Sequence, residues 1–418
     1  MPSASMLNIV NGHGLQDVKG EAPSARRAWR IVMAIRTHWF LPTSGDSRNV
    51  IPGLGGHGRP ASLEYLGQIA RAADQLGFDA VLTPTGTHCE DAWLVTMALS
   101  QHTSRLRFLV AFRPGITNPT LAAQQAATFQ RLTGGRLLIN IVTGGDTSEQ
   151  QRFGDWLSHD ERYARTDEFL AILRGAWSGT PYDFSGWHYR VKGATVQHTP
   201  DPIPEVFFGG ASNAAEDVAA RHVDAYLLWG EPPDMVRERI ERVRAKAEAE
   251  GRELRFGIRL HVIARDTEAE AWREADRLLA TMDPALVSAA QQLLSKSESV
   301  GQQRMLSLHG GDRSDLEISP NLWAGIGLVR PGAGTALVGS HEQVAERIAE
   351  YHELGLDEFI LSGHPHLEEA YAVGENVLPL LRRVAPRVSG GAGSTALVPD
   401  GPSSEPGSAE AAPRALAV

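Results

Sequence analysis

The sequence contains almost no cysteine. Cys89 is the only one among 418 residues, so no internal disulfide can form, which favours a reducing compartment. No apolar run approaches the length that crosses a membrane, and the N-terminus lacks the charged-then-apolar order of a secretory signal. From these absences we expect a soluble, cytoplasmic protein that does not associate with membranes.

The chain also lacks the positive charge of a nucleic-acid-binding protein. Its formal net charge is -10, which argues against a nucleic-acid or anionic-membrane surface. Both ends are rich in small and polar residues and have no periodic apolar face. We therefore expect a flexible extension over residues 1–29, one domain over 30–387 and a disordered tail over 388–418.

Between these ends, short apolar runs alternate with segments of helical periodicity. About eight strand–helix units follow one another in a single series. Such a series predicts an α/β fold, a (β/α)8 TIM barrel, with an open doubly wound sheet as the alternative. A Gly-rich stretch over about 284–335, before the last strand, exceeds the length of an ordinary connection, and we expect it to form a lid.

Both folds place function at the carboxyl ends of the strands. The expected strand ends are rich in His, Arg and Trp, whereas the strand middles are apolar. The candidates at these ends are His38, Trp39, residues 83–89, Arg113, Asn140, Thr143, residues 209–212, Trp229, Arg259, His261, His364 and His366, with Arg330 in the long insertion.

One expected strand, residues 255–265 (RFGIRLHVIAR), carries two unusual side chains. Arg259 and His261 are two residues apart, so they fall on the same face of the strand. Arg259, Arg330 and Arg113 can each be ordinary ion-pair partners, but an arginine on a core strand is the hardest of them to explain structurally. We interpret it as a sign of an anionic substrate beside a reactive cofactor.

Two Gly-rich turns follow neighbouring strands. They are VTGGD (142–146) and FFGGAS (207–212), where Ser212 offers a hydroxyl and free amides at a helix start. Phosphate binding and ordinary turn chemistry are about equally supported for this pair. The GLGGHG segment (53–58) has the spacing of a dinucleotide fingerprint but lacks the strand–turn–helix context, so we expect a loop there.

Other chemistries find little support in the sequence. The His364–Pro–His366 segment suggests a metal, but few carboxylates lie at the other strand ends, so we expect none. Cys89 has no partner that the sequence identifies, and a lone cysteine is most often a packing residue. No nucleophile-elbow pattern is present.

Long segments resemble the bacterial luciferase-like flavin monooxygenases, and within them the FMNH2-dependent alkanesulfonate monooxygenases. Examples are TPTGTHCEDAW, QAATFQRLTGGRLLINIVTGGD, RFGIRLHVIARDT and LEISPNLWAGIGLVRPGAGTALVG, within residues 31–385. The resemblance implies a TIM barrel with an insertion that closes over the site. It also implies FMN bound as FMNH2, supplied by a separate NAD(P)H-dependent flavin reductase, and a homo-oligomer. The implied reaction uses O2 to convert an organosulfonate into an aldehyde and sulfite.

The resemblance also implies roles for individual residues. The residues that match the flavin and phosphate region are Asn140, Thr143, Tyr163 and Ser212, with Cys89 near the flavin. The expected catalytic residues are Arg259, His261, Arg330 and His364. The expected substrate-binding residues are Trp229, Arg259, Arg330, His38, Trp39 and His366. His364 departs from the family pattern, which has an active-site tyrosine there. Two alternatives stay open: a sulfone or other organosulfur substrate, and a non-catalytic flavin-binding relative.

Overall fold

Eight parallel strands form a closed barrel in the computed structural model, which describes residues 34–51 and 58–384. β9 pairs with both β8 and β13, and β13 pairs with β1, so the ring has no free edge. This closure confirms the predicted (β/α)8 barrel and rules out the open sheet. In ring order the strands are β1 (Arg36–Phe40), β2 (Ala80–Thr83), β3 (Arg107–Phe112), β4 (Leu137–Ile141), β7 (Glu205–Gly209), β8 (Ala225–Trp229), β9 (Arg255–Arg265) and β13 (Glu358–Ser362).

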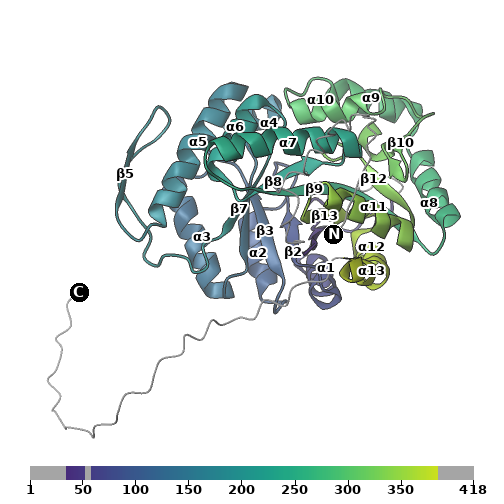
Figure 1. Cartoon of the computed structure of the whole chain (residues 1–418), viewed down its shortest axis with the longest axis horizontal. Helices are drawn as coiled ribbons and strands as arrows, with labels where there is room; N and C mark the ends of the chain where they lie inside the picture. Colours follow the sequence, from purple (N-terminus) through teal and green to yellow (C-terminus); the bar gives the residue numbers. More distant parts are fainter. Residues whose placement is uncertain (1–33, 52–57, 385–418) are drawn as a thin grey trace, which may run out of the picture.

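Helices surround the barrel and bury its outer face (Figure 1). Several begin at a capping box, in which a side chain satisfies amides that the first turn leaves free. Such boxes are present at Ser158 and Ser340. The helices are α1 (Leu63–Leu76), α2 (Ala92–Ser100), α3 (Pro119–Thr133), α5 (His159–Ala176), α6 (Asn213–His222), α7 (Pro233–Ala249), α11 (His341–Glu353), α12 (His366–Ala372) and α13 (Leu378–Val384), with a π-helical segment η3 (Val373–Val377) between the last two.

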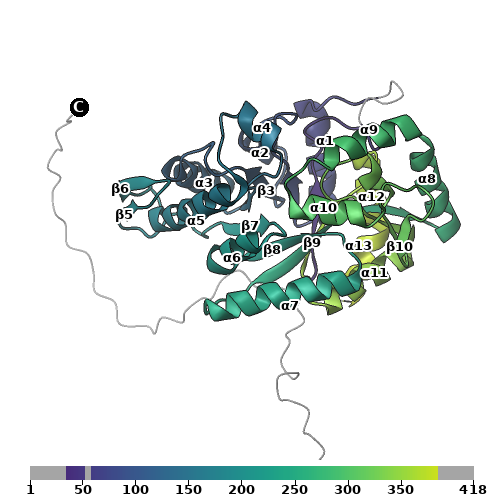
Figure 2. The same ribbon diagram turned by 90° about the horizontal axis from the view of Figure 1, so that it is seen from above.

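The long insertion is attached to β9. Its strand β12 (Ala336–Ser340) pairs in parallel with the second half of β9, outside the ring, and the sequence analysis did not predict it. Helix α8 packs against β9 and β12, and Figure 2 shows α8, α9 and α10 on one side of the molecule. The remaining elements of this region are α8 (Glu268–Ala280), α9 (Pro284–Leu294), α10 (Val300–Ser307), β10 (Glu317–Ser319), β11 (Leu322–Trp323) and the 3-10 helix η2 (Gly325–Leu328).

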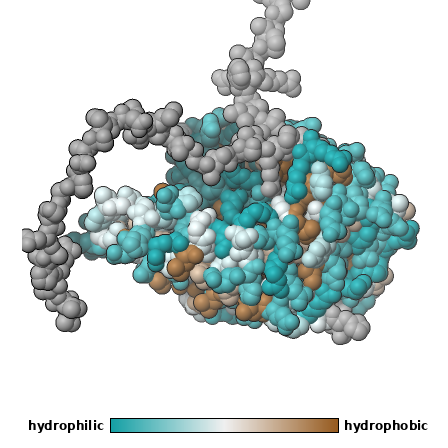
Figure 3. Space-filling view, turned by 90° about the horizontal axis from the view of Figure 1, so that it is seen from below, coloured by the Kyte–Doolittle hydropathy of each residue, from teal (hydrophilic) through white to brown (hydrophobic). Residues whose placement is uncertain are grey.

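The other long connection lies between β4 and β7. It contains the short helix α4 (Thr147–Arg152) and a hairpin of β5 (Tyr182–Ser185) and β6 (Arg190–Ala194), which projects from the barrel (Figure 1). The face seen in Figure 3 is largely hydrophilic, with separate hydrophobic patches. Among the described helices, none has both the length and the hydropathy that a membrane crossing requires. The predicted terminal extensions lie outside the described residues.

Apolar side chains close the inside of the barrel below its carboxyl end. Phe40, Leu109, Leu138, Phe207 and Ile360 belong to one buried cluster on the inner face of the strands. Their side chains form the floor of whatever space remains above them.

Candidate active site

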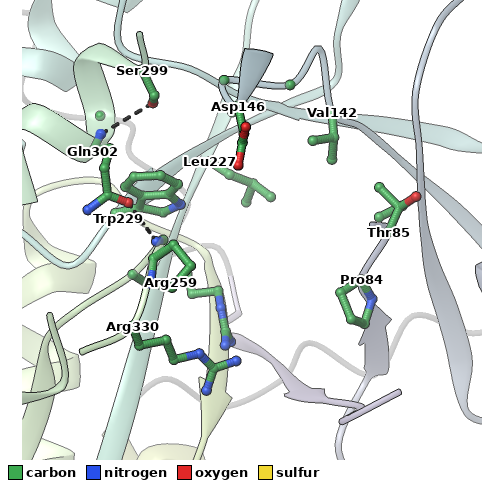
Figure 4. Close-up of a pocket in the computed structure, with 18 of the residues that line it drawn as sticks. Pro84, Thr85, Val142, Asp146, Leu227, Trp229, Arg259, Ser299, Gln302 and Arg330 are labelled. Atoms are coloured by element: carbon green, nitrogen blue, oxygen red, sulfur yellow. Dashed lines mark hydrogen bonds between the residues drawn. The ribbon is translucent and has the colours of Figure 1, made fainter. Parts of the chain in front are cut away.

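A cavity of about 810 Å³ lies at the carboxyl end of the barrel. Its volume is within the range of cofactor and ligand pockets, about 300–1,000 Å³. The insertion supplies part of its wall through Ser299, Gln302 and Arg330, which Figure 4 shows beside Trp229 at the end of β8. Most of the predicted site residues line it: Cys89, Asn140, Thr143, Tyr163, Ser212, Trp229, Arg259, Arg330, His364 and His366.

One wall is formed by the start of α6. Ser212 caps α6 by accepting a hydrogen bond from the Ala215 amide at 3.2 Å, and the buried Tyr163 hydroxyl interacts with the Ser212 side chain. A Cβ atom on Gly210 would come within 2.5 Å of Ala215 Cβ and 3.1 Å of the Tyr163 hydroxyl. Only glycine avoids this clash, so the turn packs directly against α6 and Tyr163, and the helix start directs amide donors and a positive dipole end toward the cavity.

The opposite wall carries two guanidinium groups. Arg259 lies with its Cζ atom 4.0 Å from the centre of the Phe40 ring, and Arg330 lies 5.5 Å from the same ring. Figure 4 shows them side by side. Neither forms an ion pair with a carboxylate in the described part of the chain, and Arg259 Nη1 is buried without a hydrogen-bond partner. Both side chains are half-buried, and both line the cavity.

This wall has a positive potential that the nearby Asp46 carboxylate offsets only in part. Burial, and then the charge of Arg330, lower the pKa of Arg259 well below its ordinary range. Burial also lowers the pKa of Arg330, against weaker opposing effects of Cys89 and Asp46. Two like charges close together in a poorly solvated space are costly, so this wall is suited to bind an anion.

Three buried histidines lie beside the arginines. The rings of His261 and His364 stack with their centres 5.4 Å apart, and His364 meets His366 edge-on at 5.2 Å. Burial is the largest influence on each of the three and lowers its pKa. The imidazoles are therefore neutral near pH 7, and the charge of the wall comes from the arginines.

Asp46, His364 and His366 have the spacing of a possible metal site. One ligand atom of each lies within 4.8 Å of the others. However, the Asp46 carboxylate already accepts hydrogen bonds from His366 and from Tyr65, and the two guanidinium groups repel a cation. The electrostatics of this group therefore favour an anion over a metal ion.

A charged cluster lies at the mouth of the cavity near Cys89. Glu149 pairs with Arg113 and with His88. Burial raises the pKa of Glu149, but hydrogen bonds from His88 and Arg113 outweigh it and lower the pKa to about 2. Hydrogen bonding to Cys89 and Glu149 raises the pKa of His88 to about 10. This cluster neutralises Arg113, which is therefore unlike Arg259 and Arg330.

Three predicted residues do not line the cavity. His38 points into the barrel interior, where its Nε2 lies 2.7 Å from Glu358 Oε2. Trp39 packs against Phe78 outside the ring and donates its indole N–H to the His366 carbonyl. Their positions give no support to substrate binding. His261 lies behind His364, with its Nδ1 2.9 Å from Ser362 Oγ, so it acts on the cavity only through its neighbours.

Sequence reasoning missed two residues of the wall, Asp46 and Gln302. Asp46 belongs to a loop, and its contact with His366 joins segments that are 320 residues apart. Gln302 lies in α10, accepts a hydrogen bond from the Gly332 amide at 2.9 Å and leaves its side-chain nitrogen unpartnered. Neither occupies the end of a barrel strand, so the rule used for the other candidates does not find them.

A TIM barrel with its cavity at the carboxyl ends of the strands is the usual framework of a barrel enzyme. Residues 35–358 match the luciferase-like monooxygenase family, and the chain belongs to that family.

Solved structures with the same fold include three enzymes. A riboflavin lyase (RcaE) is 22% identical, with a TM-score of 0.73 over 85% of this chain and 93% of its own. A long-chain alkane monooxygenase (LadA) is 21% identical, with a TM-score of 0.69 over 86% and 94%. EDTA monooxygenase (EmoA) from Chelativorans sp. BNC1 is 22% identical, with a TM-score of 0.69 over 85% and 95%. These identities support the fold and leave the substrate open. Structures of this fold are known with a modified FMN and with an F420 adduct.

Proposed function

We propose that the protein is a two-component FMNH2-dependent monooxygenase that uses O2 to convert an organosulfonate into an aldehyde and sulfite. The observation that carries this proposal is the pair Arg259 and Arg330, which has no carboxylate partner in the described residues and faces a cavity. A sulfonate remains anionic at physiological pH, so fixed cations are the groups that bind it.

FMN would bind at the wall formed by the start of α6. The α6 N-terminus, Tyr163 and Ser212 would hold its phosphate, and Asn140 and Thr143 would line the rest of its site. When bound in reduced form, the flavin supplies the activation of O2. We expect a separate NAD(P)H-dependent flavin reductase to deliver it, as the resemblance to the alkanesulfonate monooxygenases implies.

The remaining residues of the cavity bind the sulfonate, orient it and exclude water. Arg259 holds the sulfonate from a barrel strand, whereas Arg330 does so from the insertion, so anion binding stabilises the insertion over the site. The neutral His364 has a ring nitrogen that can accept a proton during the reaction, and His261 positions the His364 ring by stacking against it. Trp229 and Gln302 cover the cavity and help to exclude water.

A sulfone substrate is a weaker candidate. A sulfone is uncharged, so it would leave the two guanidinium groups without a counter-ion. A non-catalytic role would leave the same pair unexplained.

Sulfite release from a panel of sulfonates tests the proposal. We expect sulfite only when FMN, a generic flavin reductase with NADH, O2 and a sulfonate are all present. The Arg330→Met variant should raise KM by at least about tenfold, since it removes one charged contact. Tight binding of oxidised FMN without oxygen-dependent turnover on any sulfonate would instead identify a non-catalytic relative.

A further inference from the structure

The cavity wall contains a hydrogen-bond acceptor that a sulfonate cannot satisfy. It is the Nε2 atom of His366, which has no hydrogen-bond partner in the described part of the chain. The side chain is 2% exposed and lines the cavity. A buried polar atom without a partner is costly, and in a ligand site it marks the position of a complementary group.

Asp46 determines the chemical character of this nitrogen. Asp46 accepts hydrogen bonds from the His366 backbone amide at 2.8 Å and from the Tyr65 hydroxyl at 2.5 Å, and its Oδ1 lies 2.8 Å from His366 Nδ1. Burial raises the pKa of Asp46, but these contacts, led by His366, lower it to about 2. Asp46 is therefore an ionised carboxylate that can only accept hydrogen bonds. It holds the ring proton of His366 on Nδ1, which donates to it.

The neutral ring then presents a lone pair at Nε2. Burial lowers the pKa of His366 despite the opposing effect of Asp46, so the ring carries one proton near pH 7. A sulfonate has only acceptor oxygens at this pH and cannot pair with the lone pair. A hydroxyl group can, because its O–H donates.

The acceptor and the cationic pair face the same part of the cavity. The Phe40 ring lies 5.7 Å from the His366 ring, 4.0 Å from Arg259 Cζ and 5.5 Å from Arg330 Cζ. A single small molecule can therefore contact both. An ammonium donor would suffer repulsion from the two guanidinium groups, whereas an uncharged hydroxyl would not.

We propose that the substrate is a hydroxylated organosulfonate, whose sulfonate binds Arg259 and Arg330 and whose hydroxyl group donates a hydrogen bond to His366 Nε2. This inference rests on the proposed desulfonation and adds the class of substrate. A water molecule bound at Nε2 is the competing explanation, and it would give no preference for a hydroxyl group.

Matched substrates and matched variants separate the two explanations. The substrates are 2-hydroxyethanesulfonate and ethanesulfonate, and the measured quantity is the ratio of their kcat/KM values. His366→Asn keeps an N–H near the position of Nδ1 for Asp46 and removes Nε2. His366→Gln places an amide near Nε2 and loses the donor to Asp46. His352→Asn is the control, because His352 is buried, bonds to the Leu356 carbonyl through Nδ1 and does not line the cavity.

We expect the wild type and His352→Asn to prefer the hydroxylated substrate by at least about tenfold. His366→Asn should bring the ratio close to one, and His366→Gln should keep part of the preference. Titration of the intrinsic tryptophan fluorescence, to which Trp229 in the cavity wall contributes, with each sulfonate and without turnover should give the same order of affinities. A wild-type ratio near one, or an unchanged ratio in His366→Asn, would overturn the inference while sulfite release still supported desulfonation. No sulfite from either compound or from the wider panel would contradict the proposed function itself.

The tautomer of His366 gives a readout that does not depend on activity. In 15N-histidine-labelled protein, the signals missing from His366→Asn belong to His366. We expect them to show a protonated Nδ1 and an unprotonated Nε2. A proton on Nε2 near pH 7 would overturn the assignment of this nitrogen as an acceptor.

Discussion

Arg259 and Arg330 are held side by side without an ion-pair partner among the residues that the structure describes, and this arrangement opposes folding. Each guanidinium loses hydration, and each repels the other. Removal of an unpaired buried charge should therefore stabilise the protein while it destroys the anion site. Stability and activity are expected to change in opposite directions at this position.

The Arg259→Met variant tests this expectation. We predict that its free energy of unfolding rises by about 1 kcal/mol or more, since the variant replaces an unpaired charge with an apolar side chain of similar length. Sulfonate turnover should fall at least about 100-fold in kcat/KM. Urea denaturation and the sulfite assay measure the two quantities.

Arg265, on the same strand, is the matched control. It forms two hydrogen bonds to the buried Glu369, at 2.8 and 3.0 Å. Arg265→Met leaves this carboxylate unpaired, so it should lower the free energy of unfolding. If both methionine variants destabilised the protein equally, the account of Arg259 as an uncompensated charge would be wrong.

The sequence alone could single out Arg259 but could not judge His38. A cation that alternates with apolar residues on a core strand is unusual wherever the strand lies. His38 also stands near a strand end, but its environment depends on the neighbouring strand, from which the buried Glu358, the register partner of Arg36, reaches the His38 ring. That pairing joins residues 320 positions apart, and no local pattern encodes it. Trp39 lies on the other face of β1 because side chains alternate along a strand.

At the scale of elements, the start of α6 is the site that we propose for the flavin phosphate. It has a serine cap, and Gly210 allows the preceding turn to pack closely against the helix. Helix α1 has the same kind of cap, because Ser62 accepts a hydrogen bond from the Tyr65 amide at 3.2 Å. The two helices therefore allow the cap and the phosphate site to be separated experimentally.

We predict that Ser212→Ala and Ser62→Ala each lower the free energy of unfolding by about 1 kcal/mol, the usual effect of a lost N-cap. Only Ser212→Ala should also weaken FMN binding, by about tenfold, because only its hydroxyl faces the cavity. FMN fluorescence quenching measures the affinity. Equal FMN affinity in the two variants would place the phosphate elsewhere.

The insertion was predicted in position but not in structure. Its length and glycine content are visible in the sequence, and the structure brings Arg330 to the cavity as expected of a segment that covers the site. The strand β12 was missed because its partner, the second half of β9, was assigned only to the barrel. The order of the eight barrel strands and of the helices between them was predictable, since each buries one apolar face against the next.

At the scale of the molecule, the buried histidines make folding depend on pH. His261, His364 and His366 have lowered pKa values in the folded state, with burial as the leading cause. The unfolded chain therefore takes up protons first as the pH falls through about 6.5. The contribution of the neutral histidines to the free energy of unfolding is complete above this pH and is lost as the pH falls below it.

We predict that the free energy of unfolding falls between pH 7 and pH 5, by up to about 1.4 kcal/mol per pH unit for each histidine. His88 offsets a small part of this loss, because its raised pKa of about 10 gives a stabilisation that grows until the pH falls below its unfolded pKa of about 6.5. The carboxylates with lowered pKa values, Asp46 and Glu149, lose their contribution only at lower pH. Urea midpoints at pH 7, 6 and 5 measure the slope, which should be shallower in His364→Asn. A stability that does not change over this range would contradict the assignment of neutral histidines.

The order of the chain divides the cavity wall into two blocks of sequence. The residues of the phosphate wall, from Asn140 to Ser212, all precede α6, whereas Trp229, Arg259, Arg330 and His366 all follow it. Phe40 and Asp46, next to the first strand, are the exceptions. A single genetic crossover within α6 can therefore exchange most of the substrate pocket between members of the family while the cofactor wall is inherited intact. Recombination within α6 is therefore a simple way to change the substrate pocket, both in natural evolution and in protein engineering.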